Sequence, residues 1–167
     1  MIWQWLIVAL AIWLSISLAY VLRLRTLVHG RERTVLADLE GLAVVAGSWT
    51  AALSSASHRD WRRSVEGLQR VVETLSSSAS LEARVGAASD IRSLLEQAGR
   101  WVRQDPEAFP AGIHGAAEDL RNALEGTQAS LDDYQAAAAD AAFASHRFPL
   151  SLMAAAVGLR VRRPQEG

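Results

Sequence analysis

The chain begins with an uninterrupted apolar run from Met1 to Leu22 that contains no ionisable side chain. As a helix rising about 1.5 Å per residue, this run reaches roughly 33 Å, which is enough to cross the hydrocarbon core of a bilayer. Trp3, Trp5 and Tyr20 lie near its two ends, where aromatic side chains gather at membrane surfaces. The pattern predicts a single transmembrane helix over residues 1–22.

Basic residues follow this apolar run, and none precedes it. Because positive charge is retained on the cytoplasmic side, Arg23 and Arg25 place the N-terminus outside and the rest of the chain in the cytoplasm. The alternative is a cleaved signal peptide, since Ser17, Leu18 and Ala19 satisfy a small-x-small cleavage rule. A signal peptide would carry a basic region before its apolar run, so the order of charges favours an anchor. The candidate anchor residues are Trp3, Trp5, Tyr20, Arg23 and Arg25.

The segment after the apolar run shows the period of a helix. Val28, Val35, Leu42 and Trp49 recur every seven residues. This spacing predicts one apolar face of a long helix that runs on from the membrane span. Gly30 interrupts it and is a candidate joint, because a glycine inside a helix costs about 1 kcal/mol.

Three further helices are predicted downstream. The second covers Trp61 to Leu75, and a serine-rich stretch ends it. Ser80 can cap the third helix, and Glu82 in its first turn suits the helix dipole. Two prolines then require a loop over residues 104–112, and a fourth helix follows from about Ala111 to Arg147. The apolar stripe of the third helix is expected at Leu81, Val85, Ala88, Ile91, Leu95, Ala98 and Val102.

These helices must pack together, because each apolar face is too large to remain in water and short links imply antiparallel neighbours. We therefore expect an all-α fold, in which an N-terminal single transmembrane helix is followed by an elongated antiparallel three- or four-helix bundle. The expected domains are the transmembrane anchor at residues 1–22, the cytoplasmic helical bundle at 23–147, and a Phe-Pro apolar segment with a basic tail at 148–167.

Composition excludes several kinds of chemistry. The chain has no cysteine, which excludes disulfides, thiolate ligands and cysteine nucleophiles, and its formal net charge of −1 gives no general attraction to nucleic acid. The Glu-x-x-His signature of di-iron bundles, the Gly-rich phosphate loop and the G-x-S-x-G turn are also absent from the sequence. We therefore expect no enzymatic activity, no cofactor, no metal and no nucleic-acid partner. Asp132, Asp133 and Asp140 cluster on the fourth helix and form either a solvated face or a cation site.

A second apolar segment follows the predicted bundle. Pro149 ends the fourth helix, because the residue before a proline is kept out of the α region. Leu150 to Leu159 has ten residues, whereas a membrane span needs about 20. The segment covers a groove of the bundle, lies on the membrane with its arginines at anionic headgroups, or binds a neighbouring protein. Its candidate interaction residues are Phe148, Pro149, Leu152, Met153, Leu159, Arg160, Arg162 and Arg163.

A spaced set of residues links the fourth helix to this segment. The set is Tyr134, Ala137, Asp140, Phe148, Pro149, Leu152, Ala154 and Gly158. In these residues the chain resembles the LemA family of membrane-anchored bacterial proteins. Ala141 and Ala142 stand where the family usually has Tyr-Asn, which indicates a divergent member. The resemblance implies a bacterial cell membrane, an outside N-terminus and a cytoplasmic helical bundle, and it brings no catalytic residues.

The expected function follows from this placement. We expect a non-enzymatic scaffold or adaptor at the cytoplasmic face of the membrane. A thin bundle cannot easily bury all of its apolar surface, which favours a homo-oligomer or contact with another membrane protein. Ala11, Ser15 and Ala19 add a stripe of small residues that either joins two spans or simply faces lipid. The alternative function is a membrane-tethered sensor or a ligand- or cation-binding bundle, in which Gly30 and the acidic cluster would take part.

Overall fold

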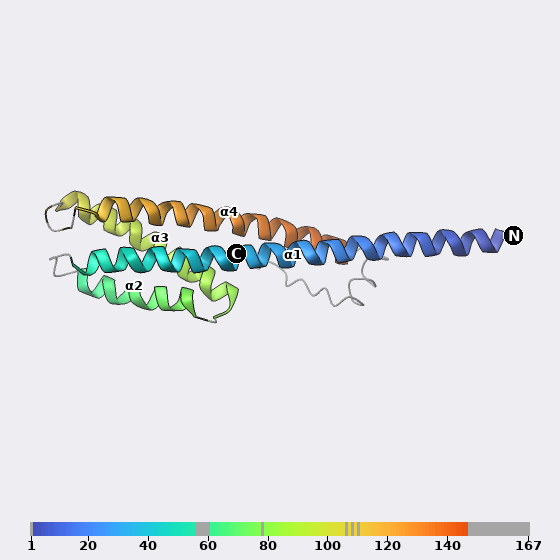
Figure 1. Ribbon diagram of the computed structural model, residues 1–167, viewed down its shortest axis with the longest axis horizontal. Coiled ribbons are helices and arrows are strands. Elements are labelled where there is room, and N and C mark those ends of the chain that lie inside the picture. Colours follow the sequence, from blue (N-terminus) through green and yellow to red (C-terminus); the bar gives the residue numbers. More distant parts are fainter. Residues whose placement is uncertain are drawn as a thin grey trace. The chain divides into compact units, whose positions relative to one another are not determined.

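The structure is a computed structural model of the chain, and it describes residues 2–55, 61–77, 79–105, 107, 109 and 111–146. Within these residues the chain forms four α-helices and no strand, as Figure 1 shows. Their bounds are Ile2–Ser54 for α1, Trp61–Ser76 for α2, Leu81–Gln104 for α3 and Ile113–Ser145 for α4. The prediction of an all-α fold with one long apolar N-terminal helix is confirmed.

The helices are divided between two compact units, and α1 and α4 contribute to both. The four-helix unit is Val35–Ser130 and holds the last part of α1, all of α2 and α3, and the first part of α4. The two-helix unit is residues 1–34 with 131–167, of which the structure describes 2–34 and 131–146. The domain boundary expected at residue 22 rests on membrane topology and the one expected at residue 147 rests on the Phe-Pro helix break, so both stay predictions.

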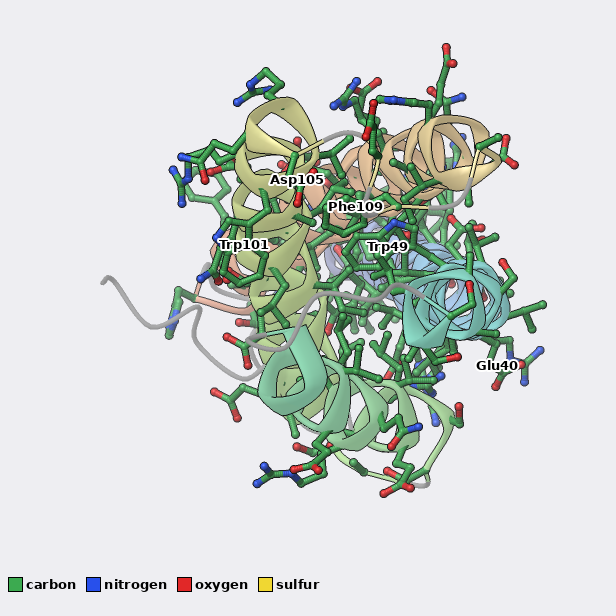
Figure 2. The ribbon with its side chains drawn as sticks, turned by 90° about the vertical axis from the view of Figure 1, so that its left-hand side faces the viewer. Glu40, Trp49, Trp101, Asp105 and Phe109 are labelled. Carbon is green, nitrogen blue, oxygen red and sulfur yellow. The ribbon has the colours of Figure 1, made fainter. Side chains whose placement is uncertain are left out.

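The core of the four-helix unit is built from the predicted helix faces. Figure 2 looks along these helices and shows side chains from all four filling the space between them. Three of the four heptad positions of α1 lie in this unit and are buried, with Val35 and Trp49 at 0% exposure and Leu42 at 1%, whereas Val28 of the two-helix unit is half-buried. Helix α2 packs against α3 and buries the two leucines of its stripe. The other large, fully buried side chains of this unit are Leu39, Leu42, Leu53, Leu68, Leu75, Ile91 and Leu120.

Helix α3 begins at the predicted cap. Ser80 has extended backbone angles, and its hydroxyl oxygen accepts a hydrogen bond of 3.3 Å from the backbone N–H of Ala83. Glu82 lies in the first turn, where a carboxylate opposes the positive end of the helix dipole. At the other end, the backbone N–H of Asp105 donates to the carbonyl of Trp101 at 3.0 Å. The residue that the sequence predicts as the N-cap of this helix, Ser80, is therefore confirmed.

The buried face at the start of α3 differs from the predicted stripe. Arg84 and Ala87 are buried, whereas Val85 and Ala88 are only half-buried. The buried positions run 84, 87, 91, 95, 98 and 102, so the face is displaced by one residue at its start. An arginine can occupy such a position because its aliphatic stem packs like an apolar side chain. The predicted positions Ile91, Leu95, Ala98 and Val102 are confirmed as buried.

Helix α1 passes through Gly30 without a break, so the candidate joint is not a joint in this structure. The hydroxyl of Thr34 donates to the Gly30 carbonyl at 3.2 Å, as a residue four positions on in a regular helix can. A Cβ atom added at Gly30 would meet nothing within 4 Å. Gly30 therefore lowers the helix propensity at this position but does not interrupt the helix.

In the two-helix unit, the alanine-rich end of α4 packs on α1. Leu24 forms one buried cluster with Ala141 and Ala144, and Val28 packs against it. Small side chains on α4 let the leucine approach closely. One helical turn further along α1, the guanidinium of Arg31 pairs with the Asp133 carboxylate at 2.8 Å. Alanine packing and this ion pair together join the two helices.

Candidate functional site

The first part of α1 carries the largest exposed apolar surface in the part of the chain that the structure describes. From Ile2 to Trp13 every residue is exposed, and Trp3 and Trp5 expose 78% and 72% of their surface. The helix is long and apolar enough to span a membrane. Only 11% of its most apolar 18-residue stretch is buried inside the protein. An exposed surface that is apolar on all sides of a helix requires lipid or a protein partner around it.

Hydroxyl groups within this surface are satisfied inside the helix. Ser15 donates to the carbonyl of Ala11 at 2.8 Å, and Ser17 donates to the carbonyl of Trp13 at 2.9 Å. A membrane interior offers no water for such groups, so each must find a partner within the protein. The two serines of the run therefore do not oppose its burial in lipid.

The other predicted anchor residues lie at the end of this surface. Tyr20 is about half exposed, and Arg23 and Arg25 are exposed on the next turn. The arrangement is an apolar helix segment followed by an aromatic residue and then by cations. That order is compatible with a membrane boundary near residue 22, while the orientation of the chain across a membrane stays a prediction.

Two other predicted sites have different outcomes. The candidate interaction segment, which is Phe148, Pro149, Leu152, Met153, Leu159, Arg160, Arg162 and Arg163, lies outside the described residues. In the acidic cluster, Asp133 is engaged by Arg31, and Asp132 and Asp140 are exposed on α4. Across the described residues no three His, Cys, Asp or Glu side chains gather as a metal site would require. The cluster therefore has no geometry that favours its cation-binding alternative.

A hollow lies in the four-helix unit between α1, α3 and α4. Its volume is about 350 Å³, within the range of small-molecule pockets. Trp49 enters it from α1, and Figure 2 shows this side chain directed into the space between the three helices. The apolar part of its lining is Trp49, Leu95, Ala98, Val102, Ile113 and Ala117. The mouth is polar and is formed by Arg103, His114, Glu118 and Arg121.

Trp49, which lies beside this hollow, carries an unpaired donor. Its side chain is fully buried, yet the indole Nε1 has no hydrogen-bond partner in the structure. A buried N–H without an acceptor costs roughly 1–3 kcal/mol, so native proteins rarely keep one without a compensating partner. The indole N–H is therefore an unsatisfied donor that the surrounding packing closes off from solvent.

A second hollow of about 500 Å³ adjoins the first along α3 and α4. The two share Leu95, Gly99, Arg103 and Arg121 in their linings. Arg92 and Arg100 line the second hollow, together with two glutamates. Within the described part of the chain, none of these four arginines forms an ion pair. The α3–α4 groove is therefore lined by guanidinium groups that are available to an anion.

Sequence reasoning missed both Arg84 and this hollow. An arginine next to apolar residues is expected to face water, so the sequence does not point to Arg84. Its side chain is only 7% exposed, its Nε and Nη2 have no hydrogen-bond partner, and its nearest carboxylate is Glu40 at 3.9 Å. The apolar stripe of α1 correctly predicts that Trp49 is buried. A stripe on one helix cannot reveal a hollow that is lined by three helices. For the arginines of α3 and α4, the sequence predicts only that they lie on a charged surface.

Comparisons with protein-family models, with curated proteins and with solved structures found no match for this chain.

Proposed function

We propose that the chain is a single-pass membrane protein, similar to the LemA family, whose helical bundle serves as a non-enzymatic scaffold or adaptor at the cytoplasmic face of a bacterial cell membrane. The observation that carries the proposal is the exposed apolar surface of α1 from Ile2 to Trp13. In water such a surface would drive aggregation, whereas in a bilayer it is the ordinary exterior of a spanning helix.

The packing of the two-helix unit supports a retained anchor over a cleaved signal peptide. Ser17 and Val21 are buried, with Val21 at 1% exposure, and both lie in the same helix as Leu24. Cleavage after Ala19 would remove Ser17 and cut a helix whose next turns pack on α4. The segment before Arg23 therefore belongs to the folded unit, which favours its retention.

The absence of cysteine makes the topology directly testable. Gln4→Cys and Glu66→Cys each introduce a single thiol, one in the first turn of the span, at its outer end, and one on an exposed position of α2. With a membrane-impermeant maleimide on intact cells, we expect labelling of the first variant. The second should react only after the cells are made permeable. The opposite pattern would reverse the orientation, and loss of the chain from membranes in alkaline carbonate would refute the anchor. Mass spectrometry of the extracted protein separates an intact N-terminus from cleavage at Ala19.

The scaffold part of the proposal predicts contacts with other membrane-bound proteins or with further copies of the chain. Outside the span, Val44 is a large apolar residue of the four-helix unit with 74% exposure. A photoreactive amino acid at this position, in the full chain at native abundance, is expected to give cross-linked adducts. Placement of the same group at exposed Glu73 on α2 provides a charged-surface control. A chain that stays monomeric and free of adducts in its own membrane would refute the scaffold role.

A further inference from the structure

The second hollow, which is the groove between α3 and α4, is explained neither by a membrane anchor nor by a scaffold surface. It lies within the four-helix unit, has a volume of about 500 Å³ and is lined by side chains of both helices. We infer that this groove binds a small organic phosphate monoester, with the phosphate held by guanidinium groups from both helices and the organic body against apolar side chains. The inference goes beyond the scaffold proposal and does not depend on it. The arginines of the lining are Arg92, Arg100, Arg103 and Arg121.

These four arginines are within reach of a dissolved ligand. Each is exposed, and none forms an ion pair in the part of the chain that the structure describes. Glu96 lies four residues from both Arg92 and Arg100 on α3, a spacing at which side chains on a helix can pair. Neither of the two pairs forms. The groove therefore presents accessible guanidinium groups that no neighbouring carboxylate engages.

The charge balance of the lining suits a dianion. Four arginines line the groove together with two glutamates, Glu96 and Glu125, so two positive charges remain uncompensated. A phosphate monoester carries a charge of about −1.5 to −2 at pH 7, which balances this excess. A sulfate ester or a single carboxylate carries one negative charge and leaves part of the excess. A cation would be repelled by the lining.

The position of the arginines on two helices favours a phosphate over a carboxylate. A Cβ atom built at Gly99 would lie 3.7 Å from the Nη1 atom of Arg103, so this guanidinium extends back along α3 to the level of Gly99. Arg121 lines the groove from α4. A guanidinium binds two oxygens of a phosphate as a fork, and a phosphate monoester has three oxygens that accept. One phosphate can therefore be bound from both helices, whereas a carboxylate has only two oxygens in one plane.

Apolar side chains provide a surface for the rest of the ligand. Leu95 of α3 and Leu124 of α4 are buried and line the groove. Between the arginines of α3, Gly99 adds no side chain to the space. A volume of about 500 Å³ is within the range of small-molecule sites and is larger than a phosphate ion alone would fill. The remaining space favours a phosphate that carries an organic body.

The test measures binding of phenyl phosphate to the full-length chain in phosphatidylcholine nanodiscs by equilibrium dialysis, with empty nanodiscs subtracted. The pH is about 8, where the phosphate is a dianion. Phenyl sulfate has a similar shape and one negative charge fewer, and inorganic phosphate lacks the organic body. We expect phenyl phosphate to bind at least about tenfold more tightly than either, which corresponds to about 1.4 kcal/mol. Binding of either comparison compound as tight as that of phenyl phosphate, or no saturable binding above empty nanodiscs, would overturn the inference.

A second arm distinguishes a dissolved phosphate monoester from a lipid headgroup. The dialysis is repeated in nanodiscs that contain phosphatidate, whose headgroup is a phosphate monoester, and in nanodiscs that contain phosphatidylglycerol, whose phosphate is a diester. The two kinds are matched in surface charge, so that repulsion of phenyl phosphate by the membrane surface is the same in both. Weaker binding with phosphatidate identifies the lipid headgroup as the ligand of the groove. Equal binding identifies a dissolved monoester.

Variants then connect binding to the named groups. Arg103→Gln and Arg121→Gln remove one guanidinium from each helix and are each expected to weaken binding about tenfold or more. Glu125→Gln removes a negative charge from the lining and should strengthen binding. Arg70→Gln makes the same charge change at an exposed position of α2, outside both hollows, and should bind as the original chain does.

The substituted positions are all exposed, so folding should be preserved, which far-UV circular dichroism checks. Unchanged binding in both Arg103→Gln and Arg121→Gln refutes the site. Equal loss of binding in Arg70→Gln does so too, because it would show general attraction to a charged surface. Either result leaves the membrane topology and the scaffold proposal untouched.

Discussion

Arg84 gives the sharpest stability prediction, because the structure buries it without satisfying it. Its side chain is 7% exposed, and its Nε and Nη2 atoms have no hydrogen-bond partner. We expect Arg84→Met to stabilise the four-helix unit, since methionine keeps an unbranched apolar stem and removes the charge. The usual direction for truncating a buried side chain is the opposite.

The magnitude can be worked from the contacts of the guanidinium. Two unpaired buried donor groups cost roughly 1–3 kcal/mol each. Against this stands the attraction to Glu40 at 3.9 Å, which is about 4 kcal/mol at an effective dielectric constant of 20. The Glu40 side chain is 71% exposed, however, and pairs with such exposure contribute about 0–1 kcal/mol when measured. The balance favours methionine by about 2 kcal/mol, within the range seen when buried ionic groups are replaced by apolar ones.

Urea unfolding of the full chain in lipid nanodiscs, followed by far-UV circular dichroism, measures this balance. With a slope of about 2 kcal/mol per molar urea, a gain of about 2 kcal/mol raises the midpoint by about 1 M. Glu40→Gln is the matched control for the weak pair and should change stability by less than about 1 kcal/mol. Arg70→Met controls for charge removal at an exposed position on α2.

One result would refute this reasoning about Arg84. If Arg84→Met lowered the urea midpoint while Glu40→Gln lowered it by the same amount, the ion pair would be strong and the unpaired nitrogens would not be costly. The double variant distinguishes the cases further, because a strong pair gives non-additive effects and a weak pair gives additive ones.

Three other predictions follow from single contacts. Ser80→Ala should cost about 1 kcal/mol in urea unfolding by removing the α3 cap, whereas Ser93→Ala in mid-helix should change little. Gly30→Ala should raise stability by about 0.5–1 kcal/mol, measured by thermal unfolding, since open space surrounds its Cβ. Burial and, secondarily, the Glu32 carboxylate raise the pKa of Tyr134 above 10. The folded state therefore holds the phenol proton longer, stability should fall as pH rises above 10, and Tyr134→Phe should remove that part of the fall.

The sequence predicted the helices well because their signals are local. The start of α3 depends on one serine and one carboxylate, and the core stripe of α1 depends on a seven-residue repeat that Val35 and Trp49 share. Both can be recognised without knowledge of any other helix. The face of α3 that becomes buried is not set by local signals, because contacts with other helices decide which residues face the core. For this reason the apolar pattern predicts that Val85 is buried, whereas the structure buries Arg84.

Candidate binding geometry is harder to predict for the same reason. The lining of the hollow includes small residues of α3 and α4, Ala98, Gly99 and Ala117, together with Trp49 of α1. On each helix separately, alanine and glycine indicate propensity and nothing more. Only the alignment of three helices converts these residues into a space, and only the packing around the indole leaves its N–H without an acceptor.

The hollow makes a prediction about packing that one variant tests. An empty apolar space lowers stability. Gly99→Leu should therefore raise the urea midpoint, because leucine has the better helix propensity and fills space that a Cβ atom can enter freely. A fall in stability would show that leucine cannot enter the hollow and would refute its described geometry.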